Sequence, residues 1–159
     1  MEQTQEAYAT HLKHLTDLEH YVGKELGLTE WHEMSQERIN SFAEATEDHQ
    51  WIHLDEQRSA KESPYKKTIA HGFLVLSMAS KMTYDTYSIA DVSMGVNYGL
   101  DKVRFPNATP SGSLLRGRVS LMEYETIPGG AKYKVSVFFE LQGQEKPACV
   151  AEFLEIAYN

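Results

Sequence analysis

The chain has 159 residues, of which 42% are hydrophobic and 24% charged, a composition typical of a soluble globular protein. This length predicts a single domain that spans residues 1–159. The formal net charge of −8 argues against nucleic acid or an anionic membrane as the main partner. No apolar run approaches the roughly twenty residues of a membrane span, and no signal-peptide pattern opens the chain. We therefore expect a cytoplasmic protein.

Cys149 is the only cysteine of the chain. An intramolecular disulfide is therefore impossible, and a reducing compartment is indicated. The residue lies within the apolar run Ala148-Cys149-Val150-Ala151. In such surroundings a thiol is typically a small core side chain, so we expect Cys149 to be buried and unreactive rather than a nucleophile.

The first third of the chain predicts two helices. Residues 3–22 carry apolar side chains at helical spacing with charged residues on the other faces, and two glycines then interrupt the pattern. Ser35 is a good N-cap for a second helix, which should fray near Thr46. Residues 61–67 are polar and contain a proline, which predicts a loop.

A strongly apolar helix and a series of strands are predicted in the remainder. The segment 69–84 is apolar on nearly every face, which indicates a helix that is buried on all sides. Four later segments are predicted as strands: 92–105, 113–124, 131–141 and 147–158. Glycine-containing turns separate the last three at hairpin spacing. Helices followed by consecutive strands predict an α+β fold, in which an antiparallel sheet wraps the apolar helix.

Asp48 and His53 form a candidate acid/base pair in the polar segment after the second predicted helix. A spacing of five residues does not bring two side chains together on a helix, but in a bent loop they can converge on one water molecule. An imidazole can exchange a proton near neutral pH, and a neighbouring carboxylate can activate water or orient the ring. The alternative is an ordinary surface loop, because aspartate and histidine are common there.

His71 and Gly72 lie where the apolar helix is expected to begin. The first amides of a helix have no acceptor within the helix, and glycine allows a ligand to approach the backbone closely. Such an amide could hold a thioester oxygen as it becomes an enolate. Alternatively, Gly72 is small because a strand crosses it closely. His71 is expected to be a core or supporting residue rather than a third catalytic group.

With these residues in view, the chain resembles the MaoC-like dehydratases, the (R)-specific enoyl-CoA hydratases, and most closely the branch related to the nodulation protein NodN. The sequence Asp-His-Gln-Trp-Ile-His at 48–53 is typical of that branch, as are residues 97–99 and 103–106. The similarity covers 42–158. Three positions depart from the commonest family motif, since glycine, asparagine and proline are replaced by Glu47, Gln50 and Trp51. We expect the Glu47 side chain to face solvent.

The resemblance implies a hot-dog fold, normally paired into a homodimer, and a hydro-lyase that adds water to a trans-2-enoyl thioester. It implies that Asp48 and His53 are the catalytic dyad and that the Gly72 amide binds the thioester carbonyl. Ser80 matches a family serine in the substrate pocket, about 12 Å beyond Gly72 along the helix. Coenzyme A is implied only as part of the acyl-CoA substrate. The sequence contains no metal, nucleotide-redox or flavin motif, so we expect no bound cofactor and no metal.

Three alternatives are weighed against this function. A hot-dog acyl-CoA thioesterase is disfavoured because residues 69–84 contain no Asp or Glu. A carrier-protein dehydratase is disfavoured because its His-x-Pro-x-x-Pro-Gly signature is absent. A non-catalytic acyl-thioester binding module stays open, although the intact dyad argues against it.

The coenzyme A phosphates would require a local basic patch in this acidic protein. The candidate residues are Lys66, Lys67, Lys102, Arg104, Arg116 and Arg118. We select Arg104, in the segment Val-Arg-Phe-Pro, as the first substrate-binding candidate among them. The side chains that close the far end of the acyl pocket are not readable from the sequence, and the candidates are Leu76, Met78, Met82, Tyr84 and Tyr87.

Overall fold

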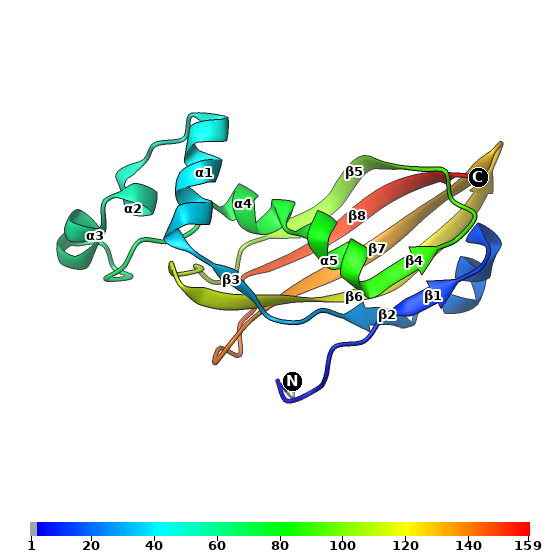
Figure 1. Cartoon of the computed structure of the whole chain (residues 1–159), viewed down its shortest axis with the longest axis horizontal. Helices are drawn as coiled ribbons and strands as arrows, with labels where there is room; N and C mark the ends of the chain where they lie inside the picture. The colour runs from blue at the N-terminus through cyan, green and yellow to red at the C-terminus, as the bar shows by residue number, and fades with distance from the viewer. Residues whose placement is uncertain (1–2) are drawn as a thin grey trace.

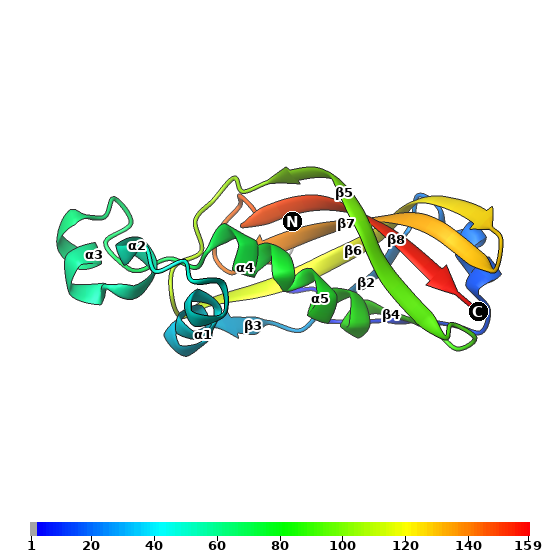
Figure 2. The same cartoon turned by 90° about the horizontal axis from the view of Figure 1, so that it is seen from above.

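The computed structural model describes residues 3–159 as a twisted antiparallel sheet with a helix lying across one face (Figures 1 and 2). The strands are β1 (Thr10–Leu12), β2 (Glu25–Leu28), β3 (His32–Met34), β4 (Tyr87–Ile89), β5 (Met94–Arg104), β6 (Ser113–Ile127), β7 (Gly130–Leu141) and β8 (Cys149–Tyr158). The helices are η1 (Leu15–Tyr21), α1 (Gln36–Thr46), α2 (Trp51–Leu54), α3 (Glu56–Glu62), α4 (Gly72–Ser77) and α5 (Ala79–Thr86).

The main sheet has the strand order β2-β6-β7-β8-β5, with β3 also paired to β6, and every pair is antiparallel. The four predicted strands, β5 to β8, are confirmed with boundaries that differ by a few residues. A small parallel pair of β1 and β4 lies beside this sheet. The predicted α+β fold with an antiparallel sheet is therefore confirmed.

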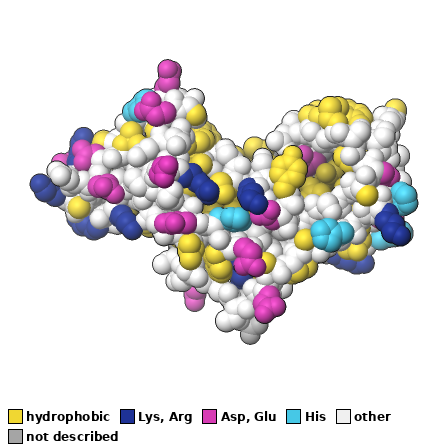
Figure 3. Space-filling model, in the orientation of Figure 1, with side chains coloured by type: hydrophobic (Ala, Val, Ile, Leu, Met, Phe, Trp, Pro, Cys, Tyr) yellow, Lys and Arg dark blue, Asp and Glu magenta, His cyan; other side chains and the backbone are white. Residues whose placement is uncertain are grey.

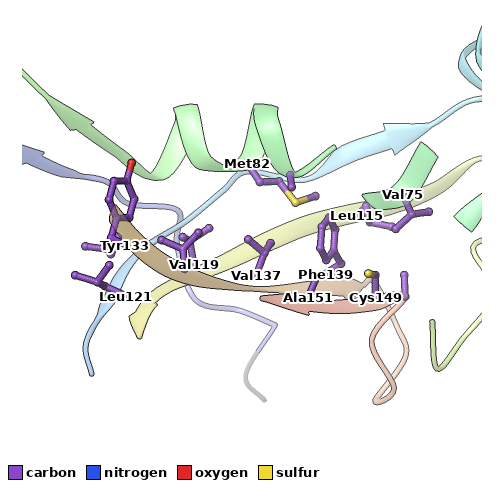
Figure 4. Close-up of a cluster of buried hydrophobic side chains, with 14 of the residues drawn as sticks. Val75, Met82, Leu115, Val119, Leu121, Tyr133, Val137, Phe139, Cys149 and Ala151 are labelled. Atoms are coloured by element: carbon purple, nitrogen blue, oxygen red, sulfur yellow. The ribbon is translucent and has the colours of Figure 1, made fainter. Parts of the chain in front are cut away.

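The hydrophobic core lies between the sheet and the helix pair α4–α5. Val75 and Met82 project from the helices toward the alternating inward side chains of β6, β7 and β8 (Figure 4). Cys149 is fully buried in this core, and burial raises the pKa of its thiol to about 12, so it stays protonated at neutral pH. Its predicted place in the core is confirmed.

The predicted helix over residues 3–22 is wrong. This segment instead contains β1 and the 3-10 helix η1. Its apolar residues Leu12, Leu15 and Leu18 are nevertheless buried. Leu12 ends β1, whereas Leu15 and Leu18 share one face of η1, because a 3-10 helix has three residues per turn. A distant contact anchors the segment, since the backbone amide of Leu15 donates to the carboxylate of Asp91 at 2.8 Å.

The second predicted helix is confirmed as α1, with Ser35 as its N-cap. The Ser35 hydroxyl accepts a hydrogen bond from the Arg38 amide at 3.2 Å. The loop predicted over 61–67 begins at residue 63 in the structure, because α3 continues to residue 62. The short helices α1 to α3 project from one end of the sheet, beyond the start of α4 (Figure 1).

The apolar segment 69–84 forms two consecutive helices, α4 and α5, which meet at Met78. The prediction that this segment is buried on all sides is wrong, because Phe73 is 70% and Tyr84 is 84% exposed. The sheet covers only one side of the helix pair. Among the helices of residues 3–159, none is long and apolar enough to cross a membrane.

Candidate active site

Asp48 lies in the turn that follows α1. Glu47 ends that helix in the left-handed conformation, with φ of 61°, and both side chains are exposed. The expectation that Glu47 faces solvent is confirmed. One carboxylate oxygen of Asp48 accepts a hydrogen bond from the Gln50 amide at 3.3 Å, which folds the turn toward α2. The glycine usual in the family suits this left-handed position, so Glu47 holds it at a conformational cost.

His53 lies on α2, a single helical turn, and is only 7% exposed. Its Nδ1 donates to the backbone carbonyl of Ile69 at 2.7 Å, and the amide of Ile69 donates to the carbonyl of Ile52 at 3.1 Å. Because Nδ1 carries the proton, Nε2 of the neutral ring is an acceptor. The pair was expected in a bent loop, whereas His53 lies on a short helical turn, Trp51–Leu54, which fixes the position of its imidazole.

His71 supports both members of the pair. Its Nε2 donates to the backbone carbonyl of Asp48 at 3.1 Å, and its ring stacks on that of His53 with centroids 3.8 Å apart and an interplanar angle of 25°. Phe42 packs against the other side at 5.0 Å. His71 thus ties the turn that carries Asp48 to the start of α4, which agrees with the supporting role predicted for it.

The two predicted dyad residues come together in space. The ionisable groups of Asp48, His53 and His71 all lie within 4.8 Å of one another. Burial lowers the pKa of the His53 imidazole, although its backbone hydrogen bond to Ile69 and the nearby Asp48 carboxylate act in the opposite direction. The ring is therefore neutral at pH 7 and can accept a proton at Nε2.

The same three residues are poorly arranged to share a metal ion. Imidazole ligates through a lone pair in the plane of its ring, at about 2.0–2.1 Å for zinc. The rings of His53 and His71 are stacked nearly parallel, so their lone pairs point side by side instead of converging on one point. The arrangement suits a proton-transfer pair beside a carboxylate better than a metal centre.

Gly72 is the first residue of α4 and follows His71 directly. Within residues 3–159 its amide donates to no protein acceptor, so the N–H is available to a ligand. A β-carbon at this position would lie 3.4 Å from the Phe105 ring, which is tight but not prohibitive. The alternative that a crossing strand requires glycine here is therefore not supported, since the neighbour is a side chain at van der Waals distance.

Ser80 is exposed on α5 and lies two helical turns from Gly72. It lines a pocket of about 670 Å³ between α4–α5 and strands β4, β5 and β8. Hydrophobic side chains surround the hollow beside β5 (Figure 3). Leu76, Tyr84 and Tyr87 line the pocket, as the sequence suggested for its closing residues, whereas the candidate Met82 is completely buried in the core.

Only some of the candidate basic residues are available to bind phosphate. Arg116 and Arg118 both pair with Glu140, at 2.6 and 3.0 Å, so the expectation that they serve coenzyme A is wrong. Arg104 is exposed and donates to its own neighbouring carbonyl. It adjoins Phe105, whose ring covers Gly72, so it lies near the start of α4. Lys66 and Lys67 are also exposed, three and two residues before the Ile69 carbonyl that holds His53.

Glu155 is a pocket residue that sequence reasoning missed. It lies on β8, in the same alternating row as Phe153 and Ala157, and all three line the pocket. A glutamate in the apolar row of a strand is the signal that was available in the sequence. It was not recognised, because which row of β8 faces inward depends on strand pairing.

Comparison with known proteins identifies the family. The model of the MaoC like domain matches residues 17–137. The 3-hydroxyacyl-thioester dehydratase Z of Mycobacterium tuberculosis is 42% identical over 139 residues, 87% of this chain and 91% of that protein. The nodulation protein N of Rhizobium leguminosarum bv. viciae is 42% identical over 146 residues, 89% of each chain.

Solved structures share the fold at low sequence identity. An (R)-hydratase from Pseudomonas aeruginosa superposes with a TM-score of 0.68 at 19% identity, covering 83% of this chain and 80% of that one. A subunit of the 3R-hydroxyacyl-ACP dehydratase complex of Mycobacterium tuberculosis does so with a TM-score of 0.66 at 16% identity, covering 80% and 90%. These neighbours confirm the predicted hot-dog fold. The chain belongs to the MaoC-like dehydratase family.

Proposed function

We propose that this protein is an (R)-specific enoyl-CoA hydratase that adds water reversibly to a trans-2-enoyl thioester. Membership of the MaoC-like dehydratases and the names of its relatives support hydro-lyase chemistry. The observation that carries the proposal is the convergence of Asp48 and a neutral His53 beside the unpaired amide of Gly72. We assign all three residues to one active site, carried by a single domain that spans residues 1–159.

In the proposed reaction the Gly72 amide binds the substrate carbonyl, and Asp48 and His53 transfer the protons. The thioester carbonyl accepts a hydrogen bond from the Gly72 amide, which makes C3 of the enoyl group electrophilic. A water held between Asp48 and His53 Nε2 loses a proton to this pair and adds to C3, and a proton returns to C2. In the reverse direction the pair removes a C2 proton and the C3 hydroxyl leaves as water. The (R) configuration of the product is inferred from the (R)-hydratase among the structural neighbours.

The acyl chain would extend from Gly72 along α4 and α5 into the pocket that Ser80 lines. The pocket begins at Leu76, one helical turn beyond Gly72, so a chain anchored at its thioester reaches it directly. We place the coenzyme A phosphates near Lys66, Lys67 and Arg104, which are exposed around the start of α4. This placement leaves the thioester at the junction of the two regions.

We further propose a homodimer that forms through β5. This strand lies at one end of the main sheet and pairs only with β8 among the described residues. Met94 and Val96 are 54% and 39% exposed and alternate with the pocket-lining Gly95 and Asn97, so they form an apolar surface outside the pocket that is suited to a partner. The 3R-hydroxyacyl-ACP dehydratase among the structural neighbours has been solved as a complex of two different subunits. Light scattering after gel filtration tests this, and a monomer at micromolar concentration would refute it.

No bound cofactor or metal has a role in the proposed reaction, since coenzyme A enters as part of the substrate. The stacked imidazoles support this assignment because they do not converge on an ion. We place the protein in the cytoplasm, where acyl-CoA thioesters are available and the single thiol stays reduced.

Hydration of crotonyl-CoA, followed by loss of absorbance from the conjugated double bond, tests the function. Asp48→Asn and His53→Ala should each lower kcat by about two orders of magnitude or more, the size typical of acid/base groups, with unchanged circular dichroism. Glu44→Gln, an exposed carboxylate of α1 that pairs with His49, is the matched control. Near-normal hydration by Asp48→Asn would refute the mechanism. Absence of hydration with all chain lengths would favour a thioesterase or a non-catalytic acyl-thioester binding module.

A further inference from the structure

The pocket along α5 is lined by both apolar and polar side chains, and a polar cluster lies on its sheet side. Leu76 and Ala79 line it close to the start of the helix pair, whereas Glu155 and Tyr133 line it from the floor of the sheet. Glu155 lies between Phe153 and Ala157 in the inward row of β8. A carboxylate in such a row loses hydration, and this loss is costly unless the group has hydrogen-bond partners.

The neighbours of Glu155 come from three other strands. On β7, Tyr133 stands directly opposite Glu155, and on β5 Asn97 does so from the other side. With its amide nitrogen facing the carboxylate, Asn97 donates to both oxygens at 3.1 Å. The hydroxyl of Tyr87, on β4, lies 3.4 Å from that of Tyr133. These four residues form what we call the polar cluster.

The polar cluster is suited to bind a ligand through hydrogen bonds rather than through an ion pair. Burial raises the pKa of Glu155 to about 7, and burial also raises the pKa of Tyr87 and Tyr133 above the usual value. Both phenols therefore stay protonated. Within residues 3–159 no Lys, Arg or His neutralises Glu155, and no ion pair includes it. The polar cluster thus presents phenolic donors and a carboxyl group to the pocket.

Building on the proposed function, we infer that the acyl chain of the substrate carries a hydroxyl group near its far end, which the polar cluster binds. A hydroxyl can donate to the Glu155 carboxylate and accept from a tyrosine at the same time. A plain methyl terminus would instead displace water from the polar cluster without replacing its hydrogen bonds. The inference concerns the class of acyl group only, and the reacting C2–C3 bond is unaffected.

The position of the polar cluster limits the chain length. Thr83, which lines the pocket one helical turn before Tyr87 of the polar cluster, lies about 16 Å beyond Gly72 at 1.5 Å of rise per residue. An extended chain advances about 1.25 Å per carbon, from a C–C bond near 1.5 Å, so roughly ten to fourteen carbons span this distance. A four-carbon crotonyl group ends well short of the polar cluster.

Binding of non-reacting saturated acyl-CoAs to the intact protein tests the inference without requiring turnover. Isothermal titration calorimetry would compare each fatty acyl-CoA with its terminally hydroxylated counterpart, at chain lengths from six to fourteen carbons. At the length that reaches the polar cluster, the hydroxylated compound should bind the wild type at least about tenfold more tightly, the order expected for a hydrogen bond to a charged group. Glu155→Leu should reverse this preference, and Glu155→Gln should reduce it.

The matched control is Glu152→Gln, because Glu152 lies on the opposite face of β8 and approaches Lys102 at 4.0 Å. This variant should keep the wild-type preference. Equal or tighter binding of the plain acyl-CoA at every length would overturn the inference while leaving the hydratase function intact. If no acyl-CoA of either kind binds, the proposed function fails and the inference fails with it. Should Glu155→Leu not fold, the wild-type preference and Glu155→Gln decide.

Discussion

Replacing Glu155 by glutamine should change how the stability of the protein depends on pH. Burial raises the pKa of Glu155 from 4.5 to about 7 in the folded protein. Because the folded pKa lies above the unfolded one, the favourable contribution of the protonated group is complete below about pH 4.5 and is lost as the pH rises through 7. Glutamine cannot ionise, so Glu155→Gln does not suffer this loss.

The size of the effect follows from the two pKa values. The interval from 4.5 to about 7 corresponds to about 3 kcal/mol at 1.36 kcal/mol for each pH unit. Solvent that reaches the pocket and the Asn97 amide, which donates to the carboxylate, both reduce this value. For a domain of this size, 1 kcal/mol changes Tm by about 2–4 °C, so the upper limit is on the order of 10 °C.

Thermal unfolding of wild type and Glu155→Gln, measured from pH 5 to pH 8, checks this prediction. The variant should become progressively more stable than the wild type as the pH rises, whatever the difference between them at pH 5. Glu152→Gln, which removes a carboxylate from the other face of β8, is the matched control. A Tm difference for Glu155→Gln that does not change across this range would refute the burial argument.

Three further predictions concern the active site and the turn before it. Because burial lowers the pKa of His53, kcat/KM for crotonyl-CoA should stay constant down to pH 6.5 and fall only below it, and a fall that begins above pH 7 would contradict this. His71→Phe keeps the ring stack but removes the hydrogen bond to the turn, so kcat should drop roughly tenfold, with His71→Ala losing more. Glu47→Gly relieves the left-handed backbone and should raise the unfolding free energy by about 0.5–1 kcal/mol in urea titrations.

Several elements were predictable because their signals are local. The alternating strands β5 to β8 and the Ser35 cap depend on neighbouring residues in the chain, so the pattern alone locates them. Residues 3–22 were misjudged because their apolar spacing suits both an α-helix and a 3-10 helix. The contact of Leu15 with Asp91, 76 residues away in the chain, decides between them.

The candidate site was predictable in its residue types and not in its geometry. Asp48, His53 and Gly72 were identified, and the structure brings the first two within 4.8 Å of His71, which directly precedes Gly72. The sequence could not indicate that His71 stacks on His53 and binds the carbonyl of the Asp48 turn, because those contacts join segments more than fifteen residues apart. The catalytic roles themselves await the variants described above.

The sequence by itself determined the α+β fold class and the family and indicated Asp48 and His53 as the candidate acid/base pair, because periodicity and short motifs carry that information. Tertiary structure alone decided which row of β8 faces the pocket, and therefore that Glu155 lines it. It also decided that one side of α4–α5 stays open. A strand reverses its two faces with a slip of one residue, so only the pairing of β8 with β5 and β7 assigns them.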